Sequence, residues 1–239
     1  MGRFRGRVHE SIESSLRKLT MTAAPSSIKI EHLGYTVAND MRRLRNRRVF
    51  ESELSQDPTD AWLRFHLGLA FYLEGDYTRT EEYLNFIFSS QSLEIPKETR
   101  SMLVSLMADI YYRQGKKMAA RSHALRAIQM GGNAFAEYLL ATLDMLDDAV
   151  ESGLRRLLDI DAQSLSRDFY RLHKGNLYAD IAKGYMRLDK FDRALQYAEL
   201  AREDEPSYEA MLIGGILCER KHDLRRALQF YTIAQTLNP

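Results

Sequence analysis

The chain has 239 residues, enough for one large domain or two small ones, and its 45% hydrophobic and 28% charged residues are typical of a folded globular protein. Lysine and arginine together number 34 and aspartate and glutamate 33, so the net charge of +1 gives no reason to expect a nucleic-acid partner. The single cysteine, Cys218, excludes an internal disulfide, and the longest apolar run, 210–218, is about half the ~20 residues of a membrane-spanning helix, so we expect a cytoplasmic protein without a transmembrane segment.

Residues 1–58 differ in pattern from the rest of the chain. Their start is rich in arginine but lacks a following apolar stretch, so we expect no secretory signal. Residues 3–9 and 28–32 alternate polar and apolar side chains, which predicts two short strands. A helix is expected to begin near Val37 and to include the arginine-rich run 42–48. Five arginines in seven residues spread round a helix axis, which favours a solvent-exposed helix; a contact to a nucleotide sugar or an anionic lipid surface is the alternative.

From residue 59 onward the chain contains a repeated pattern with a period of about 34 residues. Each copy has an apolar or aromatic stretch, a short polar turn and a second stretch with small residues one helical turn apart. The second stretches align on a small residue, namely Thr80, Ala120, Ala194 and Ala227. Gly75 and Gly115 stand where a helix must stop and reverse direction. The stretch 134–160 has helical apolar spacing but lacks the signature, and we interpret it as a degenerate copy.

This pattern resembles the tetratricopeptide repeat (TPR), a helix–turn–helix unit whose signature begins with Leu-Gly-x2-Tyr. Leu67, Gly68 and Phe71 match that beginning, with phenylalanine in place of tyrosine. The resemblance covers residues 59–239 and implies an all-α solenoid of about five repeats, one of them degenerate. Three or more stacked repeats suffice for a continuous core. We therefore expect two parts, a short β or irregular segment with a linking helix at 1–58 and the TPR solenoid at 59–239.

Four motifs in the first part resemble, in their order, the carboxy-terminal edge of the catalytic domain in bacterial family 2 glycosyltransferases that carry TPR repeats. They are Val8-His9-Glu10, the apolar-x-His-x-Gly-Tyr segment 30–35, Arg45-Asn46 and Asp57-Pro58. The resemblance implies that His9 completes a divalent-metal site for a nucleotide sugar, with Mn²⁺ or Mg²⁺ as the metal. In that family the nucleotide-binding fold and its carboxylates precede this histidine. We therefore expect that this chain alone binds no cofactor and has no glycosyltransferase activity.

In the TPR fold, the first helix of each repeat faces a concave groove that can hold an extended peptide. Equivalent positions give eight candidate groove residues: Phe65, Leu69, Tyr72, Tyr112, Arg113, Lys183, Arg187 and Arg220. Lys183 and Arg187 are four residues apart, so the two cations share one helix face and could hold a carboxylate. Two alternatives remain. The pair could be ordinary surface cations, or recognition could belong to the apolar end of the groove, at Phe65, Leu69 and Tyr72.

Two functions from different classes fit these features. In the first, the chain is the carboxy-terminal part of a family 2 glycosyltransferase, and its repeats position an acceptor or another partner. In the second, it is a stand-alone TPR scaffold or adaptor with no link to glycosyl transfer. Both predict a protein or peptide partner in the groove and no nucleic acid, and neither implies an oligomeric state.

Overall fold

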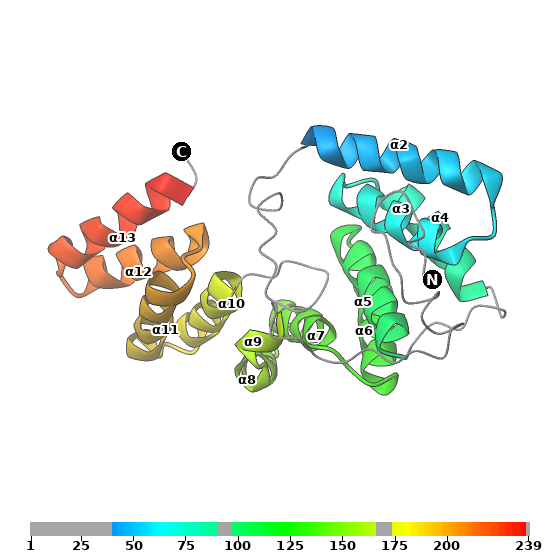
Figure 1. Cartoon of the computed structure of the whole chain (residues 1–239). Coiled ribbons are helices and arrows are strands. Elements are labelled where there is room, and N and C mark those ends of the chain that lie inside the picture. Colours follow the sequence, from blue (N-terminus) through cyan, green and yellow to red (C-terminus); the bar gives the residue numbers. More distant parts are fainter. Residues whose placement is uncertain (1–39, 90–96, 166–173, 238–239) are drawn as a thin grey trace, which may run out of the picture. The chain divides into compact units, whose positions relative to one another are not determined.

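The computed structural model describes residues 40–89, 97–165 and 174–237. The regular secondary structure in these ranges is entirely helical, which confirms the expected all-α class (Figure 1). The strands expected at 3–9 and 28–32, and with them His9, lie outside the described residues. Within the described ranges, no helix is both long enough and apolar enough to cross a membrane.

The chain divides into two compact units, Met1–Leu93 and Glu94–Pro239, and each is described by itself. In unit 1 the described helices are α2 (Asp40–Gln56), α3 (Ala61–Leu73) and α4 (Tyr77–Ser89). In unit 2 they are α5 (Lys97–Arg113), α6 (Lys117–Gln129), α7 (Ala134–Leu146), α8 (Val150–Asp159), α9 (Ala162–Leu165), α10 (Lys174–Arg187), α11 (Phe191–Asp204), α12 (Tyr208–Arg220) and α13 (Leu224–Leu237). The expected division between residues 58 and 59 stays a prediction, and α2, on its amino-terminal side, packs on α3 within unit 1.

The helices from α3 onward pair as hairpins: α3 with α4, α5 with α6, α7 with α8, α10 with α11, and α12 with α13. These are the five units that the repeat pattern predicts, including the degenerate one at 134–160. We call α3, α5, α7, α10 and α12 the first helices and their partners the second helices. The aligned small residues of the second helices are buried where each hairpin closes, and they are Thr80, Ala120, Gly153, Ala194 and Ala227. A small side chain at this position lets the two helices approach closely.

All five hairpin turns end the first helix in the same way. The middle residue of the turn has a left-handed φ, between 54° and 79°, and these residues are Gly75, Gly115, Asp148, Asp189 and His222. The next residue donates its amide hydrogen to the carbonyl five residues earlier, at 2.8–2.9 Å, as Asp76 does to Phe71. This is the Schellman motif, in which glycine is the usual left-handed residue. The repeats therefore share one turn geometry, although only two of the turns contain the glycine that marks them in the sequence.

The core of unit 1 joins α2 to the first hairpin. Phe50 of α2 is buried with Leu63, Leu67 and Phe71 of α3. Arg47, on the same helix as Phe50, forms an ion pair with Glu74. The arginine-rich helix predicted near Val37 thus exists over Asp40–Gln56, and one of its arginines takes part in packing.

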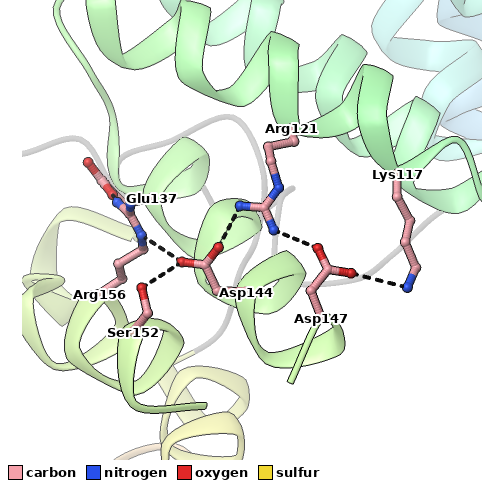
Figure 2. Close-up of polar contacts among 7 residues, drawn as sticks. All are labelled: Lys117, Arg121, Glu137, Asp144, Asp147, Ser152 and Arg156. Carbon is pink, nitrogen blue, oxygen red and sulfur yellow. Dashed lines mark hydrogen bonds and ion pairs between the residues drawn. The ribbon is translucent and has the colours of Figure 1, made fainter. Parts of the chain in front are cut away.

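An ionic network ties the degenerate hairpin to the helix before it (Figure 2). Asp144 of α7 is buried and accepts a hydrogen bond of 2.5 Å from Arg121 of α6. It also accepts hydrogen bonds of 3.0 Å from Ser152 and Arg156 of α8. Arg121 reaches Asp147 as well, at 2.9 Å. Burial raises the pKa of Asp144, but the hydrogen bonds from Arg121, Arg156 and Ser152 outweigh burial and hold that pKa below its ordinary value. The carboxylate is therefore charged and joins three helices.

Candidate functional site

The eight residues predicted for the groove all lie on first helices, but they are distributed over both units. Phe65, Leu69 and Tyr72 are on α3 in unit 1, where each is half-buried. In unit 2, two are on α5, two on α10 and one at the end of α12, namely Tyr112, Arg113, Lys183, Arg187 and Arg220. The apolar end and the cationic end of the predicted groove thus belong to separate compact units.

A chain of hydrogen bonds crosses three first helices of unit 2. Tyr138 of α7 donates its hydroxyl hydrogen to a carboxylate oxygen of Asp180 on α10. Lys183, one turn further along α10, donates to the other oxygen of Asp180 at 3.0 Å. The same ammonium group donates to Glu209 of α12. We call Tyr138, Asp180, Lys183 and Glu209 the first-helix polar chain.

Burial and charge fix the protonation states in this polar chain. Burial raises the pKa of Tyr138 far above its usual value, and the neighbouring charge of Asp180 raises it further. Burial lowers the pKa of Lys183, but the charges of Asp180 and Glu209 and the hydrogen bonds to them outweigh burial, so its pKa is raised. Near neutral pH the tyrosine therefore keeps its hydrogen-bond donor and the lysine its positive charge.

Arg187 extends the cationic surface beyond Lys183. Its guanidinium donates to Asp148 in the α7–α8 turn at 2.6 Å and to the carbonyl oxygen of Met145 at 2.5 Å. Lys183 and Arg187 thus share one face of α10, as the spacing predicts. Each of these two cations already has an acidic partner within the chain, which the spacing alone did not indicate.

The other predicted cations are engaged elsewhere. Arg113 forms a 2.5 Å ion pair with Asp109 one turn earlier on α5, and Asp109 is buried. The guanidinium of Arg220 lies over the ring of Phe191, 4.1 Å from its centroid, and lines an open pocket of about 580 Å³ at the α10–α11 turn. Tyr112 lies near the first-helix polar chain, since it contributes to the raised pKa of Tyr138.

Comparison with known proteins shows the fold. No protein-family model matches the chain, and no curated protein matches it in sequence. A chain of the APC/C hetero-tetramer Cut9–Hcn1 matches 83% of this chain with a TM-score of 0.67 and 10% identity, and the match spans 37% of that chain. A tetratricopeptide repeat protein from Parabacteroides merdae matches 83% of this chain and 73% of its own, with a TM-score of 0.59 and 15% identity. YrrB, a TPR protein, matches 81% of this chain over 94% of its own length, with a TM-score of 0.52 and 14% identity. The fold is the TPR solenoid.

Three members of the polar chain in this TPR solenoid were not predicted from the sequence. Tyr138 was missed because the hairpin at 134–160 lacks the signature, so no equivalent groove positions were assigned to it. Asp180 and Glu209 were missed because they fall outside the aligned positions. A usable signal existed for Asp180, which stands three residues before Lys183 and so shares its helix face. Among the described residues, no group of three or more His, Cys, Asp or Glu side chains is arranged to hold a metal ion.

Proposed function

We propose that the first-helix face of unit 2 binds an acidic peptide segment of a protein partner, in extended conformation. The observation that carries the proposal is the exposure of the acidic residues that now pair with its two cations. The side chain of Glu209, the partner of Lys183, is 58% exposed, and that of Asp148, the partner of Arg187, is 91% exposed. Exposed ion pairs contribute about 0–1 kcal/mol. A carboxylate of the peptide can therefore replace them at little cost in free energy.

The remainder of the polar chain supports this use of the face. The bond from Tyr138 to Asp180 is partly buried and fixes the carboxylate to which Lys183 donates. Asp180 can therefore hold Lys183 in position while the more exposed link to Glu209 exchanges. Ile216, two turns after Glu209 on α12, is exposed and offers an apolar contact for a neighbouring peptide side chain. The concave surface of a TPR solenoid suits an extended segment. Among proteins of similar fold, YrrB is described as having an unusual peptide-binding site.

Peptides selected from a random displayed library on the full chain, then synthesised, provide the probe. We expect the selected peptides to contain carboxylates. The double variant Lys183→Ala/Arg187→Ala should weaken their binding by about tenfold, which corresponds to about 1.4 kcal/mol for two partly exposed contacts. It should also reduce the dependence of affinity on salt, because two screened charge contacts are lost.

Lys190→Ala/Arg193→Ala provides a matched control, since it removes two exposed cations at the start of the second helix α11. Binding by the control variant should equal that of the wild type. If the affinity falls instead in Tyr72→Ala and not in the Lys183/Arg187 variant, recognition belongs to the apolar end of the predicted groove and the acidic-peptide proposal is wrong.

The order of motifs in residues 1–58 supports a narrower second candidate, the carboxy-terminal part of a family 2 glycosyltransferase. In that setting the solenoid would position an acceptor, and His9 would bind Mn²⁺ or Mg²⁺ together with a nucleotide sugar. The first two of the four motifs lie outside the described residues, and Arg45-Asn46 lies on α2. The competing candidate is a stand-alone TPR scaffold or adaptor.

Two measurements distinguish these candidates. An in-frame glycosyltransferase core in the genomic sequence upstream of Met1 would support the glycosyltransferase candidate. The absence of such a core would favour the stand-alone scaffold or adaptor. The chain by itself should release no nucleotide from a panel of nucleotide sugars with Mn²⁺. Nucleotide release that His9→Ala abolishes would contradict the expectation that this chain alone is inactive.

A further inference from the structure

The pocket at the α10–α11 turn carries positive charge that the proposed peptide face does not use. It is open, has a volume of about 580 Å³ and lies between the start of α11 and the end of α12. That volume is within the range of small-molecule sites in proteins. The charged side chains that line it are four cations, Lys190, Arg193, Arg220 and Lys221, and two carboxylates, Asp189 and Asp192. The pocket therefore has a net charge of +2.

Most of this positive charge is not balanced within the chain. Asp192 forms an ion pair with Lys221. In the described part of the chain, Lys190, Arg193 and Arg220 form no ion pair with a carboxylate. The two cations of the peptide face differ in this respect, since each has an acidic partner within the chain. Three cations of the pocket can therefore bind an anion without first losing an internal partner.

Aromatic rings, and not acids, position the two arginines of the pocket. The guanidinium of Arg220 lies over the ring of Phe191, 4.1 Å from its centroid. That of Arg193 lies 5.7 Å from the ring centroid of Tyr185 and donates to the tyrosine hydroxyl oxygen at 3.4 Å. A cation–π contact restricts a guanidinium but does not neutralise its charge. Both arginines are thus held in place before a ligand binds.

A neighbouring pocket on α11 has the opposite sign, so positive charge is not a general property of this surface. This second pocket has a volume of about 630 Å³. Three carboxylates and two cations line it, namely Asp192, Glu199, Glu203, Lys221 and Arg226. The ion pair between Asp192 and Lys221 borders both pockets. Of the two, the pocket at the α10–α11 turn is the one that suits an anion.

We propose that the pocket at the α10–α11 turn binds a phosphate monoester. Near neutral pH a monoester carries a charge of about −1.5 to −2 and has three acceptor oxygens. These properties match the net charge of the pocket and its three cations without acidic partners. Arginine binds phosphate through two parallel N–H groups, and within the described residues Arg220 uses none of its N–H groups in a hydrogen bond. A peptide carboxylate has a single charge and two oxygens, so it matches this pocket less well.

An NMR titration of the full chain, labelled with ¹⁵N, tests the site. Glycerol 2-phosphate, a small monoester, is added at constant ionic strength, so that general screening stays the same throughout. We expect the amide signals of residues 189–193 and 217–221 to shift and to saturate. Dimethyl phosphate, a diester with one charge, should bind about tenfold more weakly, because it lacks one charge-assisted contact.

Arg220→Gln removes the guanidinium that lies over Phe191 and should weaken binding of glycerol 2-phosphate about tenfold. Arg126→Gln on α6 is the matched control, since Arg126 is exposed and does not line the pocket, and it should leave the affinity unchanged. Lys190→Ala/Arg193→Ala should also weaken phosphate binding, although it should not change binding of the acidic peptides. The pocket and the peptide face can therefore fail independently.

A second probe distinguishes the source of the phosphate. A short peptide of phosphoserine flanked by glycines that binds more tightly than glycerol 2-phosphate would assign the site to a phosphorylated protein segment. Equal or weaker binding would assign it to a small phosphate ester. Shifts that do not saturate, or that are the same in Arg220→Gln, would show an adventitious ion only and would overturn the proposal. Equal binding of dimethyl phosphate would overturn the preference for a monoester.

Discussion

The hairpins α7–α8 and α12–α13 have the same turn geometry but are held together by different interactions. In α12–α13, Gly214 and Gly215 lie directly against the rings of Phe230 and Tyr231, and the contact is apolar. In α7–α8, Gly153 packs against the backbone of α7, and beside it the charged network of Asp144 joins α6, α7 and α8. Both hairpins thus combine a left-handed turn with a small residue where the helices close, Gly153 or Ala227, while the contacts beside it are ionic in α7–α8 and apolar in α12–α13.

The closing residue gives the largest expected effect. The signature favours alanine at this position, yet a Cβ atom on Gly153 would lie 2.7 Å from the carbonyl oxygen of Ala141 and 2.5 Å from Met145. Gly153→Ala therefore makes the degenerate repeat match the signature and should nevertheless destabilise it. Forcing a methyl group into a packed contact costs about 1–3 kcal/mol, and the upper end applies here because the atoms it meets include the α7 backbone. Helix propensity returns only about 1 kcal/mol, so we expect a net loss of about 2 kcal/mol. Amide hydrogen exchange in α7 and α8 should accelerate accordingly.

Gly68→Ala on α3 is the control for this substitution. Its new Cβ atom would meet Tyr83 at 3.4 Å, an ordinary contact, so helix propensity should make the variant neutral or slightly stabilising. Equal protection of α7 and α8 in Gly153→Ala and the wild type would mean that the two helices separate easily, and that close approach does not define this hairpin.

The ionic network gives the next largest effect. Asp144→Asn removes the charge that Arg121 and Arg156 share and places an amide hydrogen donor against one of them. Hydrogen bonds to charged groups contribute about 1.5–3 kcal/mol, and both arginines can rehydrate in part, so we expect a loss near the lower end of that range. Urea unfolding followed by circular dichroism measures it. Asp192→Asn, which removes an exposed partner of Lys221, should change the free energy of unfolding by less than about 0.5 kcal/mol.

The same network makes the hairpin sensitive to acid. The pKa of Asp144 in the folded chain lies below the ordinary aspartate value of 3.8, so its contribution to stability is complete above that pH. The contribution is lost as the pH falls through the lower, folded-state pKa. Between these pH values α7–α8 should lose protection against exchange faster than α12–α13, whose closing contact is apolar. Asp144→Asn should remove this difference, and an unchanged difference would assign the acid sensitivity to other groups.

These two hairpins also show what could be predicted from the sequence. The fold was predictable, because alternating apolar stretches and small closing residues such as Ala194 recur at a nearly constant period. The helix pairing at 134–160 was predictable from apolar spacing. The ionic network that stabilises it was not, since Asp144 contacts Arg121 and Arg156 only after three helices have packed. The first-helix polar chain could not be predicted for the same reason, because Tyr138 and Glu209 contact α10 from two other hairpins. Spacing predicts which residues share a helix face, and it does not give their partners on other helices.

The smallest effect concerns the turn that ends α12. His222 adopts a φ of 59°, a conformation that costs a residue with a Cβ atom about 1–2 kcal/mol relative to a right-handed one and costs glycine little. Glycine also has more freedom to lose on folding, by about 0.5–1 kcal/mol, so His222→Gly should stabilise the hairpin by only about 0.5 kcal/mol. Slower amide exchange in α12 and α13 measures this gain. His222→Ala keeps the Cβ atom and should give no such gain. The turns at Gly75 and Gly115 already contain glycine at this position. A gain in stability in His222→Gly but not in His222→Ala would show that this position requires a left-handed backbone and not a particular side chain.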